Sequence, residues 1–333
     1  MERSSLHVLA AFLLLGGQAQ AQDNSGAIDL AVTARPITNF RIGSTETRFG
    51  PLEFNGGLEL TAGDRNFGSL SGLRFITPGS DLLAVSDNGF WISGTINRDV
   101  EGHPASFDQA RIAEMLDQNG ERTSEKWNTD AEGLLVDGDT VTVSFERNHR
   151  IATGTLDPQT MAFTAKNEKL PVPAREMRSN RGFEALTKAP EDSPLEGARV
   201  AVTEKSLNKD GNLFAGVMEG PMKGIFFVKR DSEYDVSDGD FLPDGDLLLL
   251  ERRFSMASGV SMRIRRIKGA DIQPGATVDG PVLFEADMAY QIDNMECLDV
   301  WQRPDGATMV SLASDDNHSI LQRNLYLEFR LAE

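Results

Sequence analysis

Hydrophobic residues occur along most of the chain in short aliphatic runs separated by turn residues. The clearest runs cover residues 82–85, 140–144, 199–202, 247–250 and 308–312. Most of them follow a turn rich in proline, aspartate and glycine, such as 77–80, 137–139, 243–246 and 304–306. Apolar runs of about four to six residues bounded by such turns are typical of buried β-strands joined in hairpins. The pattern therefore predicts an all-β protein.

A short motif precedes the aliphatic runs and divides the chain into units. It consists of a carboxylate or a serine, then a small residue, then usually leucine, and it leads into a hairpin whose second strand ends in an acid. The copies begin at Ser71, Glu132, Glu184, Glu296 and, less clearly, Asp238. They lie about 50 to 60 residues apart, and a period of this length with about four strands per unit is typical of a β-propeller.

The predicted strands favour a single propeller of five four-stranded blades. The last unit has room for three strands, ending at residues 325–329, and segment 52–60 would supply the fourth and close the ring. A sixth, degenerate blade is the alternative if the N-terminal segment contributes more strands. Segment 107–116 fits either a helix or an irregular outer strand, because its apolar positions have helical spacing.

The first 21 residues have the features of a secretory signal peptide. Arg3 is followed by an apolar stretch at 6–15 and by the small-residue motif Ala19-Gln20-Ala21. We expect cleavage after Ala21, a lead-in segment at 22–45 and the propeller domain at 46–333. No later stretch is long and apolar enough to span a membrane. We therefore expect an exported, periplasmic protein, whose single cysteine, Cys297, is a buried and inert thiol.

The chain is strongly acidic, with a formal net charge of −18 and a pI of about 4.7. Nucleic-acid binding needs a surplus of lysine and arginine, so the composition argues against it. An anionic small molecule would need metal cations or a local basic patch to overcome the negative field. A closed ring of blades leaves no free sheet edge, so we expect a monomer. We expect its partner to be a small-molecule ester.

The acids of the motif are expected to converge at one mouth of the propeller. The first strand of each blade lines the central channel, which would place Ser71, Glu132, Glu184, Asp238 and Glu296 in one ring. The second strand runs back toward the same mouth, so the acids that end it would form a second ring, made of Asp87, Glu146, Glu204, Glu251 and Asp315.

Crowded carboxylates repel one another, and a hard cation is the simplest compensation. Calcium takes six to eight oxygen ligands, whereas the four histidines are too few and too scattered to favour zinc. We therefore predict Ca²⁺ as the cofactor, held by Asp87, Glu132, Glu184, Glu296 and Asp315. The alternative is that these acids accept hydrogen bonds from neighbouring blades and only hold the ring together.

Basic residues follow the second ring of acids and would form a collar over it. The residues predicted to contact an anionic substrate are Arg181, Lys205, Arg252 and His318. Simple acid–base pairing at strand ends is the alternative. The chain contains neither a G-x-S-x-G nor an H-E-x-x-H motif. Any hydrolysis would then use metal-activated water, with Glu132 or Glu184 as the general base.

Several of these segments together resemble the phytase-like family of exported bacterial proteins, also described as having esterase-like activity of phytase. The resemblance covers roughly residues 50–331 and is carried by Leu70-Ser71-Gly72-Leu73, Ala84-Val85-Ser86-Asp87, Asp130-Ala131-Glu132-Gly133-Leu134, Asn180-Arg181-Gly182-Phe183-Glu184-Ala185-Leu186, Leu249-Leu250-Glu251-Arg252-Arg253-Phe254 and Ser314-Asp315-Asp316-Asn317. The chain departs from the pattern at Cys297, where glycine is expected.

The resemblance implies a β-propeller and a hydrolase of phosphate or related anionic esters, with calcium as a candidate cofactor. It supplies no established catalytic set. Two alternatives stay open at this point. One is a non-catalytic propeller that binds a small ligand or partner with structural calcium, and the other is a lactonase-like propeller hydrolase.

Overall fold

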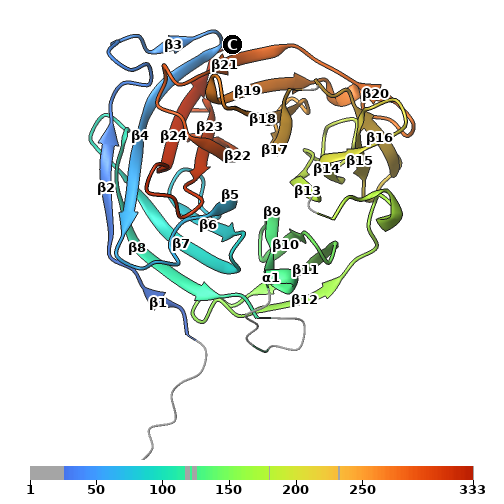
Figure 1. Cartoon of the computed structure of the whole chain (residues 1–333), viewed down its shortest axis with the longest axis horizontal. Coiled ribbons are helices and arrows are strands. Elements are labelled where there is room, and N and C mark those ends of the chain that lie inside the picture. The colour runs from blue at the N-terminus through green and yellow to red at the C-terminus, as the bar shows by residue number, and fades with distance from the viewer. Residues whose placement is uncertain (1–25, 117–120, 122–125, 180, 232, 333) are drawn as a thin grey trace, which may run out of the picture.

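Five β-sheets are arranged in a ring around a common axis (Figure 1). The structure is a computed structural model and describes residues 26–116, 121, 126–179, 181–231 and 233–332. The predicted signal peptide and its cleavage site lie outside the described residues. Each sheet is a blade whose strands pair from the centre outwards, in antiparallel fashion except for the outermost pair of blade 3, which is parallel. The prediction of an all-β propeller with five blades is therefore confirmed.

Blades 1 to 3 each begin with an inner strand that faces the axis. Blade 1 is built from β5 (Leu70–Phe75), β6 (Asp81–Ser86), β7 (Phe90–Arg98) and β8 (Pro104–Glu114). Blade 2 is built from β9 (Ala131–Asp137), β10 (Thr140–Phe145), β11 (Arg150–Leu156) and β12 (Phe163–Asn167). Blade 3 is built from β13 (Phe183–Lys188), β14 (Arg199–Leu207), β15 (Leu213–Val217), β16 (Gly224–Val228) and the short outer strand β20 (Thr277–Val278).

Blades 4 and 5 complete the ring. Blade 4 is built from β17 (Asp235–Phe241), β18 (Leu247–Ser255), β19 (Gly259–Ile267) and β21 (Val282–Ala286). Blade 5 is built from β22 (Asn294–Gln302), β23 (Thr308–Asp315), β24 (Asn324–Leu331) and β4 (Leu52–Ala62). The pairing of β24 with β4 joins the two ends of the chain, as the sequence predicted, so the ring is closed by hydrogen bonds.

Segment 107–116 lies mostly in strand β8, so the helix alternative for it was wrong and the outer-strand alternative is confirmed. Its apolar positions face the neighbouring sheet, and the long pairing with β7 overrides the helical spacing. Within the described residues, helical structure is limited to α1 (Lys126–Thr129) and the 3-10 turns η1 (Ala174–Glu176) and η2 (Gly269–Asp271). None of these elements has the length of a membrane-spanning helix.

The described part of the lead-in segment adds strands to the outside of the ring. Strand β1 (Ile28–Asp29) pairs with β8, β2 (Val32–Ile37) pairs with β4, and β3 (Arg48–Phe49) also pairs with β4. Phe40, between β2 and β3, is fully buried against Phe49, Phe54 and Phe329. The segment is therefore anchored to blades 1 and 5.

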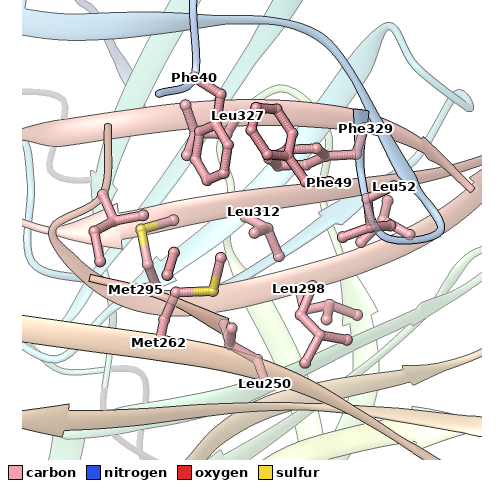
Figure 2. Close-up of a cluster of buried hydrophobic side chains, with 14 of the residues drawn as sticks. Phe40, Phe49, Leu52, Leu250, Met262, Met295, Leu298, Leu312, Leu327 and Phe329 are labelled. Carbon is pink, nitrogen blue, oxygen red and sulfur yellow. The ribbon is translucent and has the colours of Figure 1, made fainter. Parts of the chain in front are cut away.

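The hydrophobic core consists of five clusters, each lying between two neighbouring blades. Figure 2 shows the cluster between blades 4 and 5, where Leu250 and Met262 face Leu298, Leu312 and Leu327. Truncating one large, buried aliphatic side chain to alanine typically lowers the free energy of unfolding by about 2–5 kcal/mol. The five interfaces therefore hold the inner strands at fixed positions around the axis, which is what positions the site.

Candidate functional site

The sequence motif marks a β-bulge at the start of every inner strand. The register shifts by one residue between the inner and second strands of all five blades. The extra residues are Ser71, Glu132, Glu184, Ser237 and Glu296. A bulge re-aims the side chain of its extra residue. The bulges therefore turn four of these side chains, all except that of Ser237, toward one end of the axis.

The small residue after the bulge permits close approach of adjacent inner strands. A Cβ atom added at Gly72 would lie 2.9 Å from Cβ of Leu134, and one at Gly133 would lie 2.7 Å from the carbonyl oxygen of Glu184. Both distances are shorter than real contacts allow. Cys297 takes the equivalent position in blade 5 and is fully buried in the interface with blade 1. Burial, together with nearby acids, raises the pKa of the thiol well above its usual value.

The first ring of predicted residues requires one correction. In blade 4 the bulged residue is Ser237, and Asp238 is the residue after it. Ser237 is buried and donates a hydrogen bond to the carbonyl of Met295, 2.9 Å away. Asp238 lies deeper in the channel, away from the mouth. The sequence analysis placed the motif of blade 4 one residue too late in the chain, because serine and aspartate both fit its first position.

The second ring also differs in blade 4. The second-strand residues that pair two positions before the bulge are Asp87, Glu146, Glu204, Arg252 and Asp315, so that an arginine stands where the sequence suggested Glu251. Glu251 points into blade 4 instead, where it accepts hydrogen bonds from Arg263 and Arg265. Alternate residues of a strand face opposite sides. Since the motif of blade 4 was placed one residue out of register, Glu251 was predicted at the position that Arg252 occupies.

The two rings enclose a cavity of about 700 Å³ at the mouth of the propeller. All five predicted metal ligands line it, and so do two of the four predicted substrate contacts. The lining residues from the rings are Ser71, Asp87, Glu132, Glu146, Glu184, Glu204, Arg252, Glu296 and Asp315. Arg147, one of the basic residues expected in the collar, lines it too, and so do Asp130 and Asp293, which were not proposed from the sequence. Asp130 lies two residues before Glu132, so its position next to the motif was the available signal.

The carboxylates of blades 2 and 3 form two overlapping groups. Oxygens of Asp130, Glu132 and Glu146 lie within 4.8 Å of one another, and the same holds for Glu146, Glu184 and Glu204. Glu146 belongs to both groups. Among the described residues, no hydrogen bond or ion pair compensates the side chain of Glu132 or of Glu184. A third group, of Asp99, Glu101 and His103, is exposed and lies on a loop of blade 1.

Burial and mutual repulsion raise the pKa values of this set. The pKa values of Glu132 and Glu184 lie well above the usual range, first because of burial and then because of neighbouring carboxylates. Burial is also the largest cause of the raised pKa values of Glu146, at about 7, of Glu296, at about 8, and of Asp315, at about 7. Protons or cations must therefore accompany these groups near neutral pH.

Three arginines at the cavity neutralise part of this charge. The Nη1 atom of Arg181 lies 2.7 Å from Oε2 of Glu204, Nε of Arg252 lies 3.0 Å from Glu296, and Arg147 contacts Asp130. Arg252 also has Nη2 at 3.5 Å from Oε1 of Glu204. Burial alone would lower the pKa of Arg252, but the surrounding carboxylates, Glu296 first, more than offset it and raise the pKa. These arginines remain charged and bind the edges of the cluster.

The other two predicted substrate contacts lie outside this cavity. Lys205 is paired with Asp235 at 2.7 Å and lines an adjoining pocket of about 520 Å³ that also contains Arg230 and Arg253. His318 is half-exposed, with Nε2 2.7 Å from Nδ2 of Asn88. The structure thus brings Arg181 and Arg252 to the carboxylates and leaves Lys205 and His318 at the periphery.

Below the carboxylates, an arginine crosses the channel. Arg74 lies three residues after Ser71, about 10 Å further along β5, and makes two hydrogen bonds of 2.8 Å with Asp238 of blade 4. It also donates to the carbonyl groups of Leu298, Gly239 and Leu186. Both charged side chains are almost fully buried. This cross-link joins four of the five inner strands and fills the channel under the cavity.

Comparisons with known proteins place the chain in a family. No curated protein matches the sequence. Among solved structures, similar folds include a PQQ-bound aldose sugar dehydrogenase from Streptomyces coelicolor, with 12% identity, a TM-score of 0.45 and coverage of 90% of this chain and 98% of the other. An endo-arabinase from Bacteroides thetaiotaomicron has 13% identity, a TM-score of 0.45 and coverage of 74% and 89%.

A putative gluconolactonase has 10% identity, a TM-score of 0.40 and coverage of 90% of this chain and 94% of the other. The family model described as phytase-like, esterase-like activity of phytase, matches residues 65–318. This match spans all five inner strands and nearly the whole ring. The chain belongs to the phytase-like family.

Proposed function

We propose that this protein is an exported hydrolase that cleaves phosphate or related anionic esters at the acidic cavity, with calcium as its cofactor. The observation that carries the proposal is the pair of carboxylate groups that share Glu146. Their charges are compensated at the edges by arginine, whereas Glu132 and Glu184 face the cavity without a compensating partner among the described residues. Such an arrangement favours a bound cation over a structural cross-link.

The chemistry of the donor set fits calcium. Each group offers three carboxylate oxygens within 4.8 Å of one another, and Asp87, Glu296 and Asp315 line the same cavity. Hard oxygen ligands in this number suit Ca²⁺, which completes its shell with water. No histidine lines the cavity among the described residues, so the donor set does not suit zinc. Asp130, Glu132, Glu146, Glu184 and Glu204 would hold the ion or ions.

When bound, calcium would supply Lewis-acid polarisation of an ester oxygen and would lower the pKa of a nearby water molecule. The residues of this chain have separate tasks. Glu132 or Glu184 would accept the proton of the attacking water, since both side chains line the cavity. Arg181 and Arg252 would orient the anionic part of the ester from the blade 3 and blade 4 side.

The test is a calcium and activity measurement on the mature protein. Calcium content is measured, and hydrolysis of a phosphomonoester, phytate and a lactone is assayed with and without chelator. We expect bound calcium, turnover of a phosphate ester, and a loss of at least about 100-fold on chelation or in Glu132→Gln. The matched control is Glu53→Gln, since Glu53 is a glutamate of β4 far from the cavity lining.

Three outcomes contradict the proposal in different ways. Bound calcium without turnover of any substrate supports a non-catalytic, ligand-binding propeller. Turnover that survives both chelation and Glu132→Gln excludes the metal mechanism. Turnover of the lactone alone supports the lactonase-like alternative.

A further inference from the structure

One side of the cavity mouth is apolar and exposed. Phe254 is 67% exposed, Met288 55% and Leu321 87%, and all three line the same cavity as the carboxylates. Large hydrophobic side chains that remain exposed in a group, rather than singly, mark sites of interaction. The three residues come from the β18–β19 hairpin, the segment after β21 and the β23–β24 loop, so blades 4 and 5 supply all of them.

The packing of these residues makes them one surface, here called the apolar rim (Phe254, Val260, Met288 and Leu321). Phe254 and Val260 are directly paired across the β18–β19 hairpin. A Cβ atom added at Gly259 would lie 2.9 Å from Cγ of Met288, so Met288 rests on the turn of this hairpin. Leu321 faces the same space from blade 5. A molecule that occupies the cavity therefore touches the rim and the carboxylates together.

The charge of the lining limits which substrates fit. Nine carboxylate residues line the cavity against three arginines, Arg147, Arg181 and Arg252, each of which already contacts a carboxylate. Bound cations can compensate one anionic group, but a substrate with many anionic groups would meet the excess of carboxylates around the rest of the wall. An apolar substituent, by contrast, gains from removing the rim from water.

We propose that the substrate is amphiphilic, with one ester head group at the carboxylates and an apolar chain or ring on the apolar rim. This inference rests on the proposed ester hydrolysis and specifies its substrate class. The rim lies on the blade 4 and 5 side, whereas both carboxylate groups lie on blades 2 and 3. The head group and the apolar part would therefore lie across the mouth from one another. Phe254 and Leu321 act as specificity residues for the apolar part.

The experiment measures binding of a homologous series of alkyl phosphonates, from ethyl to octyl, to the calcium-loaded protein by calorimetry below micelle-forming concentrations. Phosphonates are not hydrolysed, so the result does not depend on turnover. We expect affinity to increase by about twofold per methylene, less than for full burial because the rim stays partly open to water. The double variant Phe254→Ser/Leu321→Ser should bind octyl phosphonate about tenfold more weakly and ethyl phosphonate unchanged.

The controls separate the rim from the neighbouring surface. Ile320 and Met256 are fully or almost fully exposed neighbours of Leu321 and Phe254 that do not line the cavity. Ile320→Ser and Met256→Ser should leave the series unchanged. An affinity independent of chain length overturns the inference. The inference is also overturned if the control variants weaken octyl phosphonate binding as much as the double variant does. It is overturned as well if the protein binds phosphatidylcholine vesicles and the control variants reduce this binding as much as the double variant does, since the rim would then be part of a membrane-contact surface.

Failure of the proposed function would look different. In that case no ester is hydrolysed at any chain length, while the increase of phosphonate affinity with chain length remains. If hydrolysis is observed and its KM is independent of chain length, the proposed function holds and the amphiphilic substrate class is wrong.

Discussion

The upper and lower parts of the propeller channel both hold buried acids, but a close arginine partner compensates an acid of the lower part, Asp238, whereas two acids of the upper part have no such partner among the described residues. In the lower part, Asp238 is matched by Arg74 through two hydrogen bonds, and the same guanidinium also binds carbonyl groups of two further inner strands, at Leu298 and Leu186. In the upper part, Glu132 and Glu184 line a cavity and lack such a partner among the described residues.

The difference separates a structural acid from a candidate ligand-binding acid. A buried charge is tolerated when an opposite charge and good hydrogen bonds accompany it. The five-blade ring satisfies this condition for Asp238 with its own side chain, Arg74. In the upper part the same bulged strands present carboxylates to the cavity, and the missing charge must come from protons or a bound cation. This contrast makes opposite predictions for the two parts.

The largest effect is expected for Arg74→Met in the lower part. The substitution leaves Asp238 buried without its partner, and loss of one member of a buried pair typically costs about 3–5 kcal/mol. Urea denaturation of the purified protein measures the free energy of unfolding. The double variant Arg74→Met/Asp238→Asn should recover part of the loss, because the isolated charge is removed. A loss below about 1 kcal/mol would mean that the cross-link contributes little to stability.

The opposite sign is expected for Glu146→Gln in the upper part. Glu146 is shared by both carboxylate groups, and burial first, then neighbouring carboxylates, raises its pKa to about 7. Removing its charge relieves repulsion, so the calcium-free protein at pH 8 should become more stable by about 1–3 kcal/mol. Calcium affinity should fall by at least about tenfold, measured by calorimetry. If Glu146→Gln instead destabilises the calcium-free protein, Glu146 is a structural acid that the protein itself compensates, as it does Asp238.

The pH dependence of stability is the third way to separate the two parts. Burial, as the first cause, raises the pKa of Glu296 to about 8 and that of Asp315 to about 7. A carboxyl group whose pKa is higher in the folded chain holds its proton more tightly there. Its stabilising effect is therefore fully present below the unfolded value, which is 4.5 for Glu296 and 3.8 for Asp315, and is lost as the pH rises through the folded value.

The calcium-free protein should consequently lose melting temperature, by about 5 °C or more, between pH 5 and pH 8. Calcium should restore the loss at pH 8 and have little effect at pH 5, where protons occupy the site. Differential scanning calorimetry at several pH values, with calcium or with chelator, measures both. The Glu146→Gln variant should show a smaller pH effect. A calcium-free protein that is more stable at pH 8 than at pH 5 would contradict the raised pKa values.

The sequence predicted the propeller because the feature that builds it is local. Each blade begins at a bulge, and the residues of the bulge and of the following turn are adjacent in the sequence, so the motif at Glu132 or Glu184 could be recognised directly. The closing strand β4 was predicted because blade 5 lacked a strand. The pairs that depend on distant segments, such as Arg74 with Asp238, left no local pattern.

The errors in the site arose from the alternation of side chains along a strand. In blade 4 a displacement of one residue exchanged Ser237 for Asp238, because both fit the motif, and Arg252 for Glu251, because only the glutamate fits it. A single sequence does not fix this register, since it is set by the pairing with β18. The loops after the second strands pose a similar problem. Arg147, Asn317 and His318 have positive φ, so their side chains leave the direction that an extended strand would give them.

The smallest effects are expected for the predicted substrate contacts that the structure leaves at the periphery of the upper part. Lys205 is paired with Asp235, and His318 contacts Asn88, and neither side chain lines the carboxylate cavity. Exposed or half-exposed pairs contribute about 0–1 kcal/mol. Lys205→Ala and His318→Ala should therefore change KM for the preferred ester by less than about twofold and leave kcat unchanged.

The informative comparison is with Arg181→Ala, because Arg181 has a similar exposure but contacts Glu204 inside the cavity. Its loss should raise KM by about tenfold, since charge-assisted hydrogen bonds to an anionic group contribute about 1.5–3 kcal/mol. Steady-state kinetics of the three variants on one ester measures the contrast. If His318→Ala or Lys205→Ala matches Arg181→Ala, the anion is bound by the outer collar and the adjoining pocket of Lys205. The carboxylate cavity would then hold only the cation.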